Sequence, residues 1–178
     1  MTWWETVIGA GFGAALVQGL FPFVRDWRHK KSQANYMAMR LAVTLEFYAS
    51  ACADLIQKNA NAEPPPTDEF GGTADMPELS AYPDDAEGWR AIDSALAGRC
   101  LNLRNKIHGS QGAIDSTIEY RMDDLEDTIA EQAAERGLEA WHLAVALRRK
   151  HGVAKADIVW NYVETLEGTL QKLEKARR

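Results

Sequence analysis

An uncharged run near the start of the chain constrains the fold more than any other feature of the sequence. Residues 7–24 read VIGAGFGAALVQGLFPFV, and Gln18 is the only strongly polar side chain among them. A helix of about 20 apolar residues crosses a hydrocarbon core of roughly 30 Å. The run therefore predicts a transmembrane helix. The main alternative is a helix buried in the core of a soluble protein.

The residues on either side of this run favour the transmembrane interpretation and give it a direction. Trp3 and Trp4 precede the run and Trp27 follows it, and tryptophan prefers the membrane–water interface. Basic residues occur only after the run, at Arg25, Arg28, Lys30 and Lys31. Because positive residues stay on the cytoplasmic side, the sequence predicts a single-pass protein of the cell (inner) membrane. Its N-terminus would lie outside, the bulk of the chain in the cytoplasm, and membrane lipid would be its first partner.

Small residues within the run recur at helical spacing. Gly9 and Gly13 are four residues apart, and Gly11, Ala15 and Gly19 continue that spacing on roughly the opposite face. Such rows allow two helix backbones to approach closely in lipid, although glycine is also generally enriched in transmembrane helices. The rows are consistent with an anchor that self-associates, and they predict a homo-oligomer.

The remainder of the chain is typical of an all-α protein. Apolar residues recur at steps of three or four, which predicts helices over residues 26–58, 84–109, 112–151 with a break near Asp123, and 155–176. No stretch alternates with the period of a strand. The predicted fold is an N-terminal transmembrane helix that continues into an antiparallel bundle of about four helices. The predicted domains are an anchor at residues 1–24 and a cytoplasmic bundle at residues 25–178.

One long segment interrupts the helical pattern. Residues 59–83 contain five prolines and two glycines, which predicts a flexible loop of about 25 residues. We expect its apolar side chains to hold parts of it against the bundle: Phe70, Met76, Leu79 and Tyr82. Cys52 and Cys100 fall on apolar helix faces outside any CxxC pair, so we expect two small buried hydrophobic residues.

Few residues of the sequence suggest chemistry. The net charge of −6 makes nucleic acid an unexpected partner. Glu139 and His142 share a helix face as in di-iron bundles, but a second Glu-x-x-His is missing, so neither a metal nor a cofactor is predicted. Nucleotide-binding and hydrolase motifs are also absent from the sequence.

A short motif resembles a known family of ribonucleases. Residues 103–109 read LRNKIHG, and this resembles the signature of the HEPN ribonucleases, which are helical bundles. In that family an arginine precedes a histidine by four to six intervening residues, whereas only three residues separate Arg104 from His108. The resemblance implies a general acid–base role for His108 and a phosphate-binding role for Arg104.

The overall layout resembles that of uncharacterised bacterial proteins with a Trp-rich N-terminal anchor, a basic flank and a helical cytoplasmic body. The segments that carry this resemblance are MTWWETVIGAGFGAAL, RLAVTLEFYASACADLI and GLEAWHLAVALRRKHGV. It implies no function. The sequence favours a non-enzymatic, membrane-tethered helical module that self-associates and recruits or regulates a protein partner. The alternatives are a membrane-tethered HEPN-like ribonuclease and a structural subunit of a larger membrane assembly.

Overall fold

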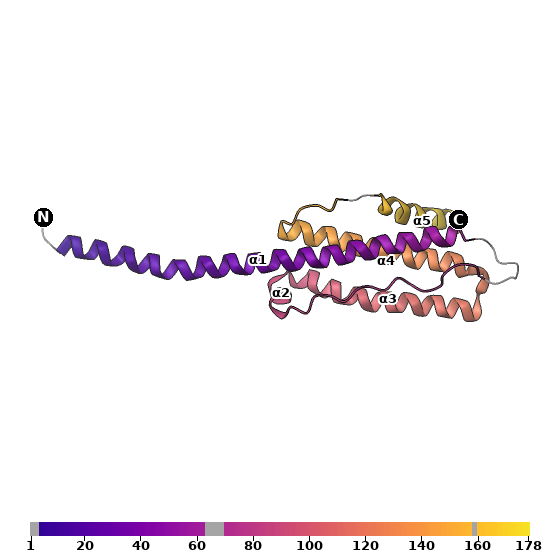
Figure 1. Ribbon diagram of the computed structural model, residues 1–178, viewed down its shortest axis with the longest axis horizontal. Coiled ribbons are helices and arrows are strands. Elements are labelled where there is room, and N and C mark those ends of the chain that lie inside the picture. Colours follow the sequence, from indigo (N-terminus) through magenta and orange to yellow (C-terminus); the bar gives the residue numbers. More distant parts are fainter. Residues whose placement is uncertain (1–3, 63–69, 158–159) are drawn as a thin grey trace.

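All regular elements of the described chain are helices, as the sequence predicted (Figure 1). The computed structural model describes residues 4–62, 70–157 and 160–178, and within these ranges it describes side chains from His29 onward. No helix among the residues so described is both long enough and apolar enough to cross a membrane. The predicted span at residues 7–24 lies outside the residues with described side chains, so it stays a prediction.

The first helix, α1, is the longest element and runs without interruption from Trp4 to Ala60. Its 57 residues correspond to a length of about 85 Å. The C-terminal part of α1 lies in the bundle, whereas the N-terminal part extends beyond it (Figure 1). The sequence was therefore right to continue the first helix into the bundle.

The bundle is organised around α4 (Leu125–His151). Helices α1, α3 (Ser94–Tyr120) and α5 (Tyr162–Ala176) each pack against it. These three helices run in one direction and α4 runs in the other (Figure 1). Because an extended segment returns the chain from the end of α1 to the start of α3, these two consecutive long helices are parallel rather than antiparallel.

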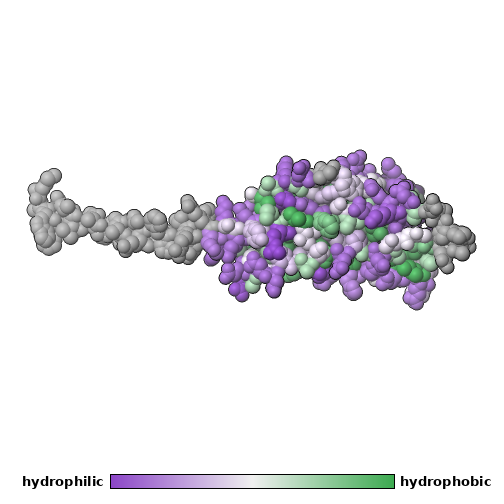
Figure 2. All heavy atoms as spheres, viewed as in Figure 1, coloured by the Kyte–Doolittle hydropathy of each residue, from purple (hydrophilic) through white to green (hydrophobic). Residues whose placement is uncertain are grey.

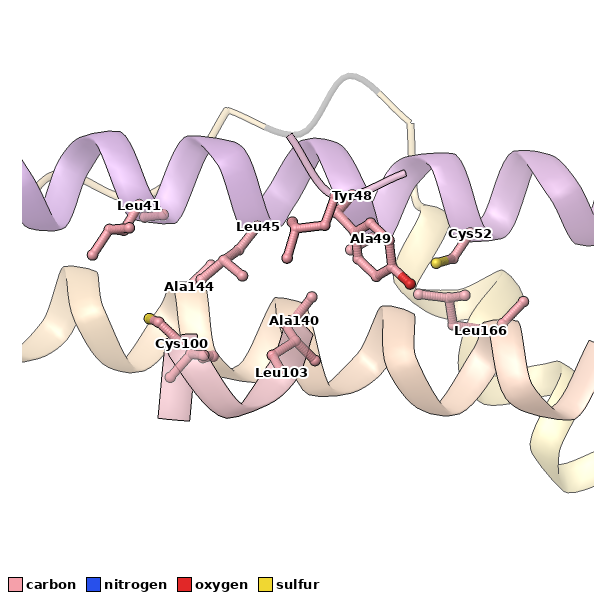
Figure 3. Close-up of a cluster of buried hydrophobic side chains, with 14 of the residues drawn as sticks. Leu41, Leu45, Tyr48, Ala49, Cys52, Cys100, Leu103, Ala140, Ala144 and Leu166 are labelled. Atoms are coloured by element: carbon pink, nitrogen blue, oxygen red, sulfur yellow. The ribbon is translucent and has the colours of Figure 1, made fainter. Parts of the chain in front are cut away.

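The core consists mainly of the inward face of α1 and the facing side of α4. Met37, Leu41, Leu45 and Tyr48 are almost completely buried on α1. Figure 3 shows Leu41, Leu45 and Tyr48 of α1 opposite Ala140 and Ala144, with Leu166 of α5 beside Cys52. Small residues on α4 bring its backbone close to α1. At Gly137, an added Cβ would lie 3.0 Å from the Cβ of Cys52 and from both methyl carbons of Leu166.

The predicted helix over residues 84–109 is in fact two helices, and the second is longer than expected. The first, α2, spans only Ala86–Ala91 and is capped by Asp85, whose carboxylate accepts from the Gly88 N–H. Asp93 then starts α3 by accepting from two backbone N–H groups, those of Ala95 and Leu96. Such capping by an aspartate satisfies donors that a helix start would leave unpaired.

Three other predicted helix boundaries were wrong, and two were confirmed. Helix α3 continues without a break past the predicted end at Gly109 and the predicted start at Gly112 to Tyr120, and the last helix starts at Tyr162 rather than at Lys155. The expected break near Asp123 is a single 3-10 turn, η1 (Met122–Asp124). Helix α4 ends at His151, and the next residue, Gly152, has a φ of 65°, the left-handed conformation that favours glycine at this position.

The described part of the segment between α1 and α2 lies along the bundle. Leu79 is buried, and the other three apolar residues expected to hold this segment also pack against the core. Gln111 of α3 accepts from the Met76 N–H at 2.8 Å, and the Tyr82 hydroxyl donates to the Cys100 carbonyl at 2.9 Å. These contacts attach the extended segment to α3.

Candidate interaction surface

A row of large apolar side chains lies on the solvent-facing side of α1, opposite the core. Tyr36, Met39, Val43 and Phe47 are 54%, 40%, 53% and 70% exposed, and we call them the outer stripe. Their steps of three and four residues place them along one helix face. Helix α1 therefore carries large apolar side chains on two opposite faces, of which the bundle covers only one. A surface helix normally carries polar residues on its outer face.

A groove lies on the surface of the bundle at the end of α4. It has a volume of about 710 Å³, and its walls include Trp141, Val145 and Val153. Figure 2 shows apolar side chains on the surface of the bundle near the end from which α1 emerges, among mostly hydrophilic ones. Trp141 is held by an edge-to-face contact with Tyr162, with ring centroids 5.7 Å apart.

An ion pair between α1 and α4 forms part of the lining of this groove. The Arg148 guanidinium donates from Nε and Nη2 to the two carboxylate oxygens of Glu46, at 2.6 and 2.8 Å. Its Nη1 donates to the Ala154 carbonyl at 2.6 Å. Because all three nitrogens of Arg148 already have partners, this side chain is engaged in holding α1, α4 and the α4–α5 connection together. The bond to Glu46 raises the pKa of Arg148 above its usual value.

The two residues of the ribonuclease-like motif lie one turn apart on α3, and both are exposed. The Arg104 guanidinium donates to the Ser80 carbonyl at 3.0 Å and lies 5.0 Å from the centre of the Tyr82 ring. These contacts attach α3 to the preceding extended segment. Neither Arg104 nor His108 lines a described groove.

The Glu139 carboxylate is engaged in a charge network rather than placed beside His142. It accepts from the Lys106 ammonium at 2.5 Å and from the Arg136 guanidinium at 2.7 Å. His142 is exposed. Glu139 thus links α4 to α3 through Lys106.

Both cysteines are buried and free, as the sequence predicted. Burial raises the pKa of the Cys52 thiol to about 12, and it raises the pKa of the Cys100 thiol to about 12 as well. At neutral pH both are therefore protonated. Since the thiolate is the reactive form, neither cysteine has the properties of a nucleophile.

Most of the residues predicted for the anchor lie outside the residues with described side chains. These are Trp3, Trp4, Gly9, Gly11, Gly13, Ala15, Gly19, Arg25, Trp27 and Arg28. Of the predicted basic flank, Lys30 and Lys31 are described, and both are exposed. Lys30 lines a shallow groove with Gln33, Glu87 and Arg90.

The outer stripe was not identified from the sequence, although the signal was present. One set of periodic apolar residues of α1, from Met37 to Leu55, forms the buried face. The second set, from Tyr36 to Phe47, has the same spacing on the opposite side of the helix. A helix that is apolar on two faces indicates a second contact surface. Comparisons with protein families, with curated proteins and with solved structures find no match for the chain.

Proposed function

We propose that the protein is a non-enzymatic helical module that is tethered to a membrane by residues 7–24 and pairs with a second copy through the outer stripe. The paired bundles would recruit or regulate a protein partner at the membrane. The observation that carries this proposal is the outer stripe itself. The exposed face of a helix rarely carries four large apolar side chains in one row, and such exposed patches mark contact sites.

A second copy fits the outer stripe because a shared membrane would align the two chains. Two α1 helices that enter the membrane in the same direction are parallel, and a two-fold axis along the membrane normal then brings identical stripes together. On a regular helix, 25 residues complete about seven turns, so Gly11 and Tyr36 have nearly the same angular position. A single two-fold axis would thus bring together both the small-residue rows and the outer stripes of two copies.

The size of the stripe is consistent with pairing in a membrane rather than in free solution. A stable interface in solution buries roughly 800 Å² on each partner, and four partly exposed side chains supply only a part of that area. Molecules held in one membrane are concentrated and share an orientation. Both effects reduce the area that a contact needs.

We expect Phe47→Glu to weaken pairing by at least about tenfold, because pairing would then remove a charge from water. The measurement is the dimer fraction of the full chain in lipid nanodiscs or dilute detergent, obtained by crosslinking. Phe47 is largely exposed, so the free energy of unfolding should change by less than about 0.5 kcal/mol.

The matched control for this variant is Leu101→Glu, which changes a large apolar residue of α3 that is 57% exposed. It should pair like the unchanged chain. If Phe47→Glu pairs as well as Leu101→Glu, then the outer stripe is not the contact.

The tether is tested separately with a full-length variant that carries Leu16→Arg and Leu20→Arg. Each arginine near the centre of a span opposes insertion by about 2.5–3.5 kcal/mol. We expect the unchanged chain to stay in carbonate-washed membranes and this variant to be released. The control carries Leu101→Arg and Ile118→Arg on the exposed side of α3 and should stay in the membrane. Release of the unchanged chain by carbonate would contradict the tether.

A further inference from the structure

We propose that the end of the bundle next to the predicted anchor docks onto anionic lipid headgroups. This inference rests on the proposed tether and adds a ligand class and a surface to it. The surface, which we call the basic end, consists of exposed cationic side chains from four parts of the chain. These are Lys30 on α1, Arg90 on α2, Arg149 and Lys150 on α4, and Lys155 in the α4–α5 connection.

Contacts between these elements place their cationic side chains at the same end of the bundle. Lys30 and Arg90 line the same shallow groove, and Arg149 and Lys155 both line the groove at the end of α4. The Asn35 amide, in the orientation that satisfies its neighbours, donates to the Lys31 carbonyl at 3.0 Å and to the carbonyl of His151 at 2.8 Å. The last turn of α4 is thus fixed beside α1 just where α1 leaves the bundle (Figure 1).

Most of the acidic side chains at the same end accept hydrogen bonds from neighbouring groups. Asp85 caps α2, Glu87 accepts from the Gln33 amide at 2.9 Å, and Asp93 caps α3. Asp93 also lies 3.4 Å from the Lys150 ammonium. The exposed Asp84 and Asp157 remain near this end, so its excess of positive charge is moderate. Among the side chains that the structure describes at this end, Lys30, Arg90, Arg149 and Lys155 protrude without an acidic partner.

His151 does not add to the positive charge at neutral pH. Burial lowers its pKa, and its Nε2 accepts from the Asp93 N–H at 3.4 Å. We therefore count only lysine and arginine in the basic end. Their charge is constant over the physiological range, so docking should depend on lipid charge and salt rather than on pH.

The opposite end of the bundle carries charges of both signs. Acidic residues surround the junction of α3 and α4: Glu119, Asp123, Asp124, Glu126, Asp127 and Glu131. Some are paired, since Arg121 contacts Asp124 and Arg177 forms two bonds of 2.7 Å with Glu131. Exposed lysines lie at this end as well, so the far end has no excess of positive charge. An anionic surface would therefore attract the end from which α1 emerges more strongly than the far end.

The distance between the predicted span and the bundle is short enough for this attraction. From residue 24 to Ala34, the first described core residue of α1, the helix rises about 15 Å. The headgroup layer covers roughly 5–8 Å of that distance. The remaining gap is close to the Debye length of about 8 Å at physiological salt, and long basic side chains reach across most of it. Cytoplasmic leaflets carry a negative surface potential, which makes anionic lipid the expected ligand.

The test measures how close the bundle lies to the bilayer in the full chain. Because both native thiols are buried, a dye can be attached selectively to Ala86→Cys at the exposed start of α2. The labelled chain is inserted into vesicles of phosphatidylcholine alone or mixed with phosphatidylglycerol, each with an acceptor lipid. We expect greater energy transfer in the mixed vesicles and a decrease of that difference as salt is added.

A triple charge reversal should abolish this difference. Arg90→Glu, Arg149→Glu and Lys155→Glu together should shift the docking equilibrium by at least about a hundredfold, since each basic residue near an anionic surface contributes about fivefold. The control reverses three exposed lysines at the far end, Lys58, Lys172 and Lys175, and changes the net charge equally. It should dock like the unchanged chain.

The two proposals fail in different ways. If carbonate releases the unchanged chain, the tether fails and this inference fails with it. If the chain stays inserted but energy transfer is the same in both kinds of vesicle, only the docking proposal is overturned. That result is also the one expected if the basic end binds an acidic protein, because the purified system contains none.

Discussion

Arg148→Met should lower the free energy of unfolding by about 3–5 kcal/mol, the largest single-residue effect that we expect. The side chains of Arg148 and Glu46 are each only 13% exposed, and they form two charge-assisted hydrogen bonds. Removal of one partner leaves the other charge buried and unpaired, which costs about this much in other proteins. Urea denaturation of the full chain in detergent, followed by helical circular dichroism, gives the value.

A second substitution distinguishes the free-energy cost of an unpaired buried charge from the cost of lost packing. Glu46→Leu combined with Arg148→Met replaces both charges with apolar groups, and this double variant should recover most of the lost stability. The matched control is Arg177→Met, which breaks a pair of similar geometry with Glu131. Because Arg177 is 61% exposed, that loss should be below about 1 kcal/mol. A double variant no more stable than Arg148→Met alone would rule out the buried charge as the cause.

Gly137→Leu should have the second-largest effect, a loss of about 3 kcal/mol. A Cβ at this position would already lie 3.0 Å from Cys52 and from Leu166, and the rest of a leucine side chain has no space between α4, α1 and α5. Overpacking of this kind costs about 1–3 kcal/mol, and more where the backbone must move. Thermal unfolding should show a midpoint lower by about 6–12 °C.

The same substitution at Gly109 provides the control. Gly109 also lies within a long helix, but a Cβ there would meet no atom within 4 Å. Gly109→Leu should therefore stabilise the chain by up to about 0.8 kcal/mol through helix propensity alone. Opposite signs at the two positions are the expected result. Equal effects at both would show that the close approach of α4 to α1 and α5 does not limit the size of residue 137.

Helical periodicity was enough to predict the class of fold and much of its core. The inward residues of α1, the burial of Cys52 and Cys100, and the end of α4 before Gly152 all follow from local patterns. The division between α2 and α3 does not, because Asp93 interrupts an otherwise regular apolar row. Gly109 was a poor guide to the end of α3 since the helix is held there by contacts from the segment around Met76.

The candidate surface was harder to predict, because its features depend on contacts between residues that are far apart in the sequence. Basic residues are favourable at the end of a helix such as α4, yet Arg148 pairs with a residue 102 positions earlier in the chain. No local pattern specifies that partner. The outer stripe could have been found in the sequence, but its exposure is known only once the bundle shows which face of α1 it covers.

The continuity of α1 has a mechanical consequence. One unbroken helix belongs to both the predicted anchor and the core, so the two parts are rigidly joined. Each residue of that helix turns the chain by about 100° and advances it by 1.5 Å. The number of residues between the anchor and the bundle therefore sets the direction in which the outer stripe faces, measured as a rotation about the membrane normal. A twist applied at one end of α1 would reach the other as a rotation of the whole bundle.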